Sequence, residues 1–366
     1  CALPILGFWP NGIGELTDVG IKQHFQLGQW IRQRYNGFLS TKFNHKEIYV
    51  RSTDVNRTLM SVQSNLAGMY YNQQNMIIPN LIWRPIPVHT IPEKSDIVML
   101  PDVCDKYVTK RAKMFTSDTF TPILKEYQYT LDSLRKIFKK PKLQFKDIWS
   151  IHDTLFCEKA HNITWDSWAT DELYKNLTNF NHVNWQIMFH GEQLQKLSGG
   201  LFLNEIIIKL NEIASKPMKE IKEKLRIYSA HDIDIAALMS AIGVYNQRQP
   251  PYASCFIIEL WKDTLKNNVF IKMYFKDDVN QKSTHLPELT FKQCKQYPCT
   301  LQKFIEVVRP TTLTLSQYNR ECFITRHKFL IWQFGIIFAI VVTLLIAYIT
   351  YLQIKTCRKN KDADFC

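Results

Sequence analysis

A short apolar strand that leads directly into an amphipathic helix, within residues 225–242, constrains the fold of this chain most strongly. The strand pattern covers residues 225–228, and apolar side chains then recur at helical spacing from Ile235 to Ile242. In α/β proteins a strand end that feeds a helix start is a ligand site, because backbone N–H groups and the helix dipole favour an anion there. The pattern therefore predicts an α/β fold with an anion site near residue 231.

The turn between this strand and this helix contains His231 and Asp232. An imidazole can donate a hydrogen bond to a phosphoryl oxygen, and a neighbouring carboxyl group can protonate a departing alkoxide. The pair therefore suits phosphomonoester cleavage at acidic pH. The simpler alternative is a helix cap, in which Asp232 only satisfies N–H groups at the start of the helix.

A second strand-to-helix turn follows residues 47–50, which read as a buried strand. Thr53 or Asp54 is expected to cap the helix, and Arg57 then lies about one turn inside it. There its planar guanidinium can hold two phosphate oxygens. The alternative for Arg57 is a solvated surface position, and Arg51 is expected to be structural.

Several further motifs have one resemblance in common. They are Trp9-Pro10 with Gly12 and Gly14, residues 83–90 (WRPIPVHT), Cys157-Glu158 with His161-Asn162, residues 167–170 (SWAT) and residues 250–255 (PPYASC). Together with the two turns they resemble the histidine acid phosphatase family, from about Trp9 to Cys322. The resemblance implies an α/β fold whose mixed central sheet is flanked by helices, with an inserted helical lobe. It also implies a phosphohistidine mechanism without metal or cofactor, in which Arg57 and His231 hold phosphate and Asp232 protonates the leaving group.

The family's nucleophile motif, Arg-His-Gly-x-Arg-x-Pro, is not found in this sequence, which joins the family pattern only at Trp9. No histidine precedes His24, and His24 lies within an amphipathic helical pattern rather than at a strand end, so we reject it as a substitute. We expect a truncated sequence of an active phosphatase. The alternative is a pseudophosphatase that only binds phosphate.

The order of elements predicts an α/β lobe built from two separated stretches. Residues 255–261 and 269–275 alternate in apolar character and predict an antiparallel pair. The predicted divisions are an α/β first part at 1–104, a helical lobe at 105–189, an α/β second part at 190–325, a transmembrane helix at 329–354 and a cytosolic tail at 355–366.

Residues 329–354 contain no charged residue and exceed the roughly 20 residues that span hydrocarbon. Aromatic residues stand near both edges, and basic residues follow. This arrangement predicts a type I membrane protein whose tail is cytosolic and whose body lies in the lumen or outside the cell. The flanking residues are Trp332, Phe334, Tyr348, Tyr351, Lys355, Arg358, Lys359 and Lys361. A lysosome, a secretory vesicle or the plasma membrane would each fit.

Six cysteines lie between residues 104 and 322, and cysteines in a lumenal protein are expected to form disulfides. Sequence alone leaves every pairing open. The resemblance implies three pairs, Cys104 with Cys322, Cys157 with Cys255, and Cys294 with Cys299. Of three N-glycosylation sequons, those at Asn162 and Asn176 are expected to be modified. Asn56 is expected to be unmodified, because a glycan beside Arg57 would obstruct substrate.

The net charge of +13 favours anionic ligands, but the basic residues are interspersed with acidic ones, so nucleic-acid binding is not indicated. Small phosphomonoesters or phosphopeptides are the expected substrates. The resemblance points to Arg32, Trp83 and Trp149 as substrate-binding residues. Each also has a structural alternative, as a core aromatic or a helix-surface charge. The resemblance further implies a homodimer with Trp83 and His89 near the contact.

Overall fold

The strands of this protein form the middle layer of its larger unit. The computed structural model describes residues 9, 11–71, 84–263, 268–294 and 298–361, with the backbone alone for 324–334 and 356–361. The chain divides into two compact units, Cys1–Tyr318 and Asn319–Cys366. The described strands are β1 (Ile48–Ser52), β2 (Leu225–Ser229), β3 (Cys255–Lys262), β4 (Val269–Lys276) and β5 (Cys299–Thr300).

Helices make up most of the remaining structure. The α-helices are α1 (Asp18–Arg34), α2 (Asn56–Met69), α3 (Asp105–Met114), α4 (Thr121–Glu126), α5 (Gln128–Ile137), α6 (Ile148–Ala160), α7 (Asp171–Met188), α8 (Gly191–Ala214), α9 (Asp232–Ile242), α10 (Leu301–Val308), α11 (Leu315–Cys322) and α12 (Ile324–Lys361). Short 3₁₀ turns occur at Glu93–Ser95, Pro101–Val103, Phe145–Asp147, Met218–Glu220 and Arg309–Thr311.

Hydrogen bonds divide the strands into two sheets. β1 and β2 pair in parallel, from Ile48 opposite Leu225 to Ser52 opposite Ser229. β3 and β4 pair antiparallel and β5 adds to the edge of β4, which confirms the predicted antiparallel pair. His89 extends the first sheet by a parallel bridge to Arg51.

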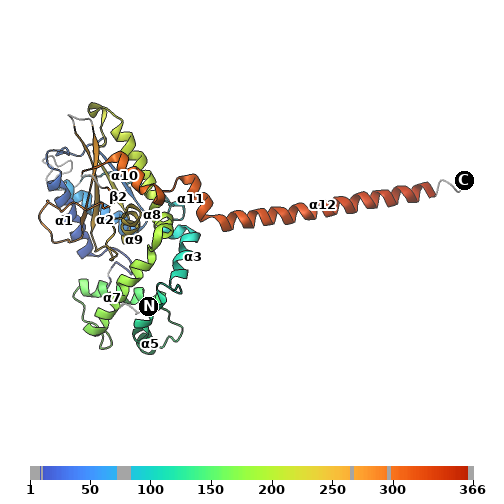
Figure 1. Cartoon of the computed structure of the whole chain (residues 1–366), viewed down its shortest axis with the longest axis horizontal. Coiled ribbons are helices and arrows are strands. Elements are labelled where there is room, and N and C mark those ends of the chain that lie inside the picture. The colour runs from blue at the N-terminus through green and yellow to red at the C-terminus, as the bar shows by residue number, and fades with distance from the viewer. Residues whose placement is uncertain (1–8, 10, 72–83, 264–267, 295–297, 362–366) are drawn as a thin grey trace. The chain divides into compact units, whose positions relative to one another are not determined.

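Both sheets pack on the same two hydrophobic cores, one on each face, so they lie in one layer. Ile227 of β2 and Ile257 of β3 pack on the core formed with α1 and α2. Tyr228 of β2 and Ile258 of β3 pack on the opposite core, formed with α8, α9 and α10. Figure 1 shows the strands between these two groups of helices. The predicted α/β architecture with strands of mixed direction is confirmed, although hydrogen bonds divide the layer into two sheets.

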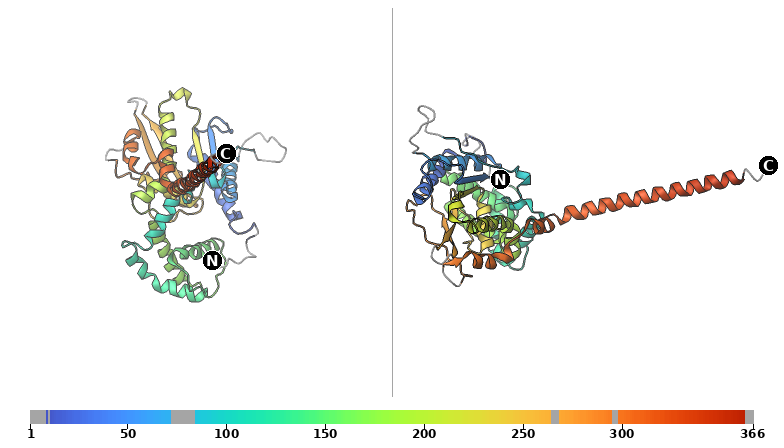
Figure 2. Two further views of the ribbon diagram at one scale, coloured as in Figure 1. Left: turned by 90° about the vertical axis from the view of Figure 1, so that its right-hand side faces the viewer. Right: turned by 90° about the horizontal axis from the view of Figure 1, so that it is seen from above.

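A third core belongs to the helices between the two α/β stretches. Apolar side chains from Phe120 to Ile187, contributed by α4, α5, α6 and α7, form one buried cluster. Figures 1 and 2 both show these helices together at one end of the larger unit. The predicted boundaries of the helical lobe stay a prediction, because the larger unit is continuous from Cys1 to Tyr318.

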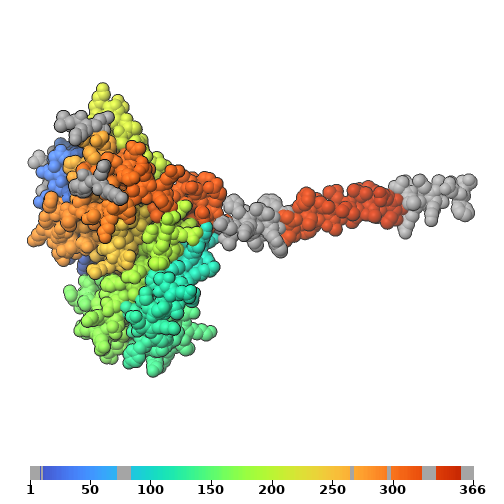
Figure 3. Space-filling model, viewed as in Figure 1, coloured from blue at the N-terminus to red at the C-terminus, as the bar shows by residue number. Residues whose placement is uncertain are grey.

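The smaller unit contains one long apolar helix. Within α12 the segment Gly335–Lys355 is long and apolar enough to cross a membrane, judged by length and composition. None of this segment is buried within the protein (Figure 3). It lies within the predicted span of 329–354 except for its last residue, Lys355.

Candidate active site

The two strand-to-helix turns meet at one edge of the parallel sheet. Because β1 and β2 are parallel and in register, Thr53 and Ser229 come together, and the Thr53 amide donates to the Ser229 carbonyl at 3.0 Å. Helix α2 begins at Asn56 and α9 begins at Asp232. This arrangement brings Arg57 next to His231.

Arg57 and His231 are in direct contact. The Arg57 Nη2 atom lies 3.3 Å from His231 Nδ1, and His231 Nε2 lies 3.3 Å from Thr53 Oγ1. Arg57 donates from Nη2, so His231 accepts at Nδ1 and is neutral, with its proton on Nε2. Burial lowers the pKa of His231 to about 4, and the Arg57 charge contributes to the shift. Arg57 is exposed, so its guanidinium is accessible to an anion.

Two carboxyl groups accept N–H groups at the start of α9. His231 is the N-cap residue, and its backbone N–H donates to Asp234 Oδ2 at 2.9 Å in a capping box. Asp232 accepts the Ile233 amide, so it satisfies one N–H group at the helix start, as the simpler alternative predicts. The expected cap of α2 is wrong, because Val55 is its N-cap and neither Thr53 nor Asp54 caps it.

Asp232 is held in an environment that favours its protonated form. Burial raises its pKa, although Gln249 Nε2 donates to its Oδ2 atom at 3.0 Å and the Ile233 amide donates to its Oδ1 atom at 2.8 Å. A carboxyl group whose pKa is raised keeps its proton to higher pH, and in that form it can act as a general acid.

Asp153 is a residue of this site that sequence reasoning missed. It lies on α6, in the helical part of the larger unit, and is partly buried. Burial raises the pKa of Asp153 to about 6, and the charge of Asp232 contributes to the rise. No local motif could have found it, because Asp153 lies on α6, far along the chain from the two strand-to-helix turns.

The other residues that the sequence singled out have different surroundings. Arg32 donates to the backbone carbonyls of Ser40 and Leu39, both at 2.7 Å, so it clamps the loop after its own helix. Its role in substrate binding stays a prediction. Trp149 is exposed on α6, and Trp83 lies outside the described residues. Arg51 is structural as expected, because it is buried and paired with Asp96 at 2.7 Å.

His24 lies inside α1 and not at a strand end. Burial lowers its pKa to about 4. Its position in the interior of a helix agrees with the sequence-based interpretation.

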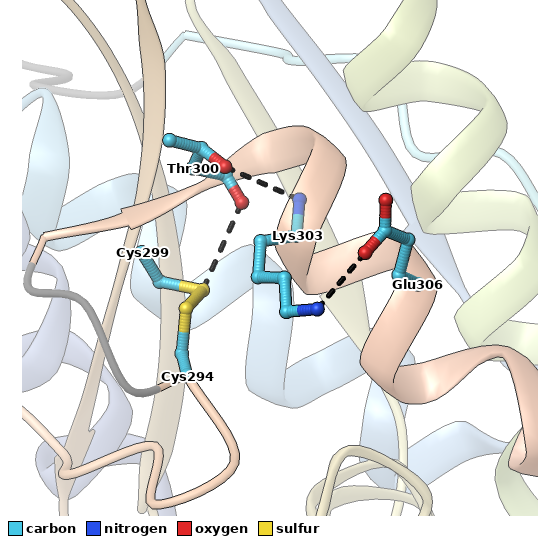
Figure 4. The surroundings of a disulfide bond; sticks show 5 residues. All are labelled: Cys294, Cys299, Thr300, Lys303 and Glu306. Carbon is cyan, nitrogen blue, oxygen red and sulfur yellow. Dashed lines mark hydrogen bonds and ion pairs between the residues drawn. A yellow bond between two sulfur atoms is a disulfide. The ribbon is translucent and has the colours of Figure 1, made fainter.

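The cysteines agree only in part with the pairing that the resemblance implies. Cys294 and Cys299 form a disulfide just before α10 (Figure 4). Cys104 and Cys322 are each disulfide-bonded. The other implied pair is not formed, because Cys157 and Cys255 are both free thiols. Tyr252 instead donates from its hydroxyl to Cys157 Sγ at 3.4 Å.

All three sequons have exposed asparagines. Asn162 has a positive φ of 55° in the turn after α6, and Asn176 lies on the surface of α7. Asn56 donates to Glu15 Oε1 at 3.1 Å, beside Arg57. Asn56 is as exposed as the other two asparagines. It differs from them in lying beside Arg57, where a glycan is expected to obstruct substrate.

Comparison with known proteins identifies the class to which this fold and site belong. Residues 5–276 match the model of the histidine phosphatase superfamily, branch 2. The chain is 36% identical to lysosomal acid phosphatase of Xenopus laevis over 98% of this chain and 82% of that protein. It is also 36% identical to prostatic acid phosphatase of Bos taurus over 87% of this chain and 82% of that protein. This chain therefore belongs to the histidine phosphatase superfamily, branch 2.

Solved structures support the same fold. The apo form of Hafnia alvei phytase aligns with a TM-score of 0.62 at 17% identity, covering 83% of this chain and 89% of that one. The same phytase in complex with tartrate aligns with a TM-score of 0.63. At this identity the likeness shows the fold and not the substrate. The related acid phosphatases are phosphoric monoester hydrolases, so this chain is of an enzymatic family.

Proposed function

We propose that this protein is a membrane-anchored acid phosphatase that hydrolyses phosphomonoesters through a phosphohistidine intermediate. The main support is the meeting of Arg57, His231 and Asp232 at the ends of two adjacent parallel strands. A phosphoryl group placed there would face a guanidinium, an imidazole and a helix N-terminus, all of which favour an anion. Small phosphomonoesters or phosphopeptides are the proposed substrates.

Each residue has a distinct part in the proposed reaction. Arg57 holds two phosphoryl oxygens, and His231 donates a hydrogen bond to the same group. As the bond between phosphorus and the leaving oxygen breaks, Asp232 gives its proton to that oxygen and becomes a carboxylate. The nucleophilic histidine of the family motif is not a residue of the printed sequence, so only the binding and protonation steps are assigned here.

The proposed setting is a lumenal or extracellular body on a single type I membrane span. Gly335–Lys355 would form the span, and the basic residues after it would hold the tail in the cytosol. We also propose glycans at Asn162 and Asn176 and a homodimer with His89 near the contact. Size-exclusion chromatography with light scattering, on the detergent-solubilised chain, tests the dimer.

Phosphate binding and turnover test the proposed function separately. The full chain in detergent should bind inorganic phosphate, and Arg57→Ala should weaken this binding about tenfold or more. Arg309→Ala is the matched control, because Arg309 is an exposed arginine on a different element. Turnover is measured on the native protein purified from tissue and on a recombinant form with the same N-terminus, in which Asp232→Asn should retain phosphate binding but reduce hydrolysis of β-glycerophosphate. Phosphate binding without turnover in the native protein would favour a phosphate-binding pseudophosphatase, and loss of neither property in Arg57→Ala would refute the site.

A further inference from the structure

A chain of hydrogen bonds runs from His231 into the turn that follows β1. His231 Nε2 lies 3.3 Å from Thr53 Oγ1, and Thr53 Oγ1 lies 2.8 Å from Thr58 Oγ1. The Thr58 hydroxyl in turn faces the backbone carbonyls of Val55 at 2.8 Å and Thr53 at 3.1 Å. Both threonines are buried. The chain therefore begins at the candidate site and ends on the backbone of the turn.

The carbonyls at the end of this chain fix the direction of each hydrogen bond in it. A carbonyl oxygen can only accept, so the single hydroxyl proton of Thr58 is donated to the backbone. Thr53 then donates its own proton to Thr58 Oγ1 and has only lone pairs left for His231. His231 therefore donates from Nε2, and its Nδ1 atom keeps a lone pair. The same form follows independently from Arg57, which can only donate to Nδ1.

We propose that Thr53 is a positioning residue that acts through His231. Oriented by Thr58, it holds the proton of the neutral imidazole on Nε2, so that an anion bound at Arg57 shares one proton with Nδ1. The inference rests on the proposed function, in which His231 faces the phosphoryl group and forms a hydrogen bond with it.

The lone pair on Nδ1 determines what the anion must bring. An oxygen without a proton and a ring nitrogen without a proton repel each other, so a hydrogen bond between them needs one proton. A phosphate monoanion carries this proton, and a dianion must take it from solvent. The free protein rarely has it above pH 5, because burial and the charge of Arg57 lower the pKa of His231 to about 4.

The other neutral form of His231 would break the chain of hydrogen bonds. With the proton on Nδ1, the Nε2 atom becomes an acceptor, and the Thr53 hydroxyl would have to turn toward it. The two threonine oxygens, 2.8 Å apart, would then have no proton between them unless Thr58 gave up its carbonyl partners. Buried polar groups that lose their hydrogen bonds are costly, so the two threonines disfavour this form.

The charged groups around His231 act on any bound anion. Arg57 lies on α2, Asp232 and Asp234 lie on α9, and Asp153, whose pKa responds to the charges of Arg57 and Asp232, lies on α6. With the shared proton counted, bound sulfate and bound phosphate monoanion present the same total charge to these groups. The ratio of their affinities therefore isolates the proton at Nδ1.

Sulfate and inorganic phosphate, titrated by calorimetry into the full chain in detergent, test this role without turnover. Sulfate carries no proton at pH 5 or pH 6, whereas inorganic phosphate is mainly a monoanion at both values. The ratio of sulfate affinity to phosphate affinity should therefore fall about tenfold from pH 5 to pH 6, as linkage to one proton requires. A ratio that does not change with pH in the unaltered protein overturns the proposal.

Variants of the two threonines separate positioning from structural support. Thr53→Val removes the acceptor at Nε2 and lets the proton move to Nδ1, so the ratio should become nearly independent of pH. Thr53→Ser keeps the hydroxyl and should retain the tenfold fall. Thr58→Val frees the Thr53 hydroxyl to donate to Nε2, so it should also give a pH-independent ratio and serves if Thr53→Val does not fold.

Ser64→Ala is the matched control for these variants. Ser64 lies on α2, as Thr58 does, and its hydroxyl donates to the Met60 carbonyl at 2.8 Å, outside the chain of hydrogen bonds. This variant should keep the tenfold fall. A purely structural role for Thr53 predicts weaker binding of both anions in Thr53→Val with the fall retained, and that result would overturn the proposal.

The outcome is distinguishable from that of the proposed function. Native protein that shows the tenfold fall but does not hydrolyse β-glycerophosphate would refute the phosphatase and retain the role of Thr53. Hydrolysis together with a pH-independent ratio would do the reverse. If neither anion binds, the site on which both proposals rest is refuted.

Discussion

The contact between α1 and α2 gives a sharp test of how the fold positions Arg57. The two helices approach so closely that a Cβ atom at Gly28 would lie 1.9 Å from the backbone oxygen of Asn65. Gly68 makes the reciprocal contact, where a Cβ atom would lie 2.0 Å from the backbone oxygen of Phe25. Backbone atoms cannot rotate away, so an added methyl group requires one helix to move.

The cost of Gly28→Ala follows from this geometry. An ordinary contact begins near 3.4 Å, so the backbone at Asn65 must retreat by about 1.5 Å, from 3.4 Å minus 1.9 Å. Overpacking of this kind costs about 3 kcal/mol. Replacing a helical glycine by alanine regains about 1 kcal/mol. We expect a net loss of about 2 kcal/mol in the free energy of unfolding.

Gly20→Ala, in the same helix, is the matched control. There the nearest atom to an added Cβ is the Leu16 Cδ1 atom at 2.6 Å, the end of a flexible side chain. Urea unfolding should show Gly20→Ala to be as stable as the unaltered protein or more so, and Gly28→Ala to be less stable. Phosphate affinity should also fall in Gly28→Ala, because α2 positions Arg57. Equal unfolding midpoints for the two variants would refute the packing argument.

Three further predictions concern other parts of the larger unit. Burial lowers the pKa of His152 from 6.5 to about 4. Between these two pH values the unfolded chain binds a proton that the folded chain does not, so the free energy of unfolding falls as the pH falls. His152→Phe should reduce this slope in urea unfolding by up to about 1.4 kcal/mol per pH unit, and an unchanged slope would contradict the assignment. Replacing Cys294 and Cys299 by Ser opens a loop with a sequence separation of 5 and should cost about 2 kcal/mol in unfolding without reductant. Peptide mass spectrometry of protein from secretory cells should find glycans at Asn162 and Asn176, and unmodified peptides at both sites would contradict their assignment.

The parts of the site that sequence predicts are those set by local pattern. Each strand-to-helix turn is a continuous segment, and parallel pairing of β1 with β2 brings their ends to the same edge. Arg57, His231 and Asp232 could therefore be placed together without knowledge of the packing. The N-cap residues of α2 and α9 could not be predicted exactly, because a shift of one residue changes which side chain faces the helix start.

The rest of the site depends on contacts that no local pattern encodes. Asp153 lies on α6 and Asp232 on α9, and the effect of the Asp232 charge on the pKa of Asp153 depends on how the fold places these two helices. Arg32 has the helical spacing of a surface arginine, whether it clamps its own loop or faces a substrate. The carbonyls of Ser40 and Leu39 that it binds lie in a loop whose course the sequence does not predict.

On the proposed function, the charges of the site also explain why acidic pH would suit the reaction. His231 contributes a hydrogen bond but no charge above about pH 4, so Arg57 and Asp232 determine the local charge balance. Burial raises the pKa of Asp232, and a protonated Asp232 adds no negative charge beside the substrate. A phosphomonoester has a second pKa of about 6 and is mainly a monoanion below it. Substrate and Asp232 would thus both gain protons as the pH falls, which limits the repulsion between them and keeps the proton donor loaded.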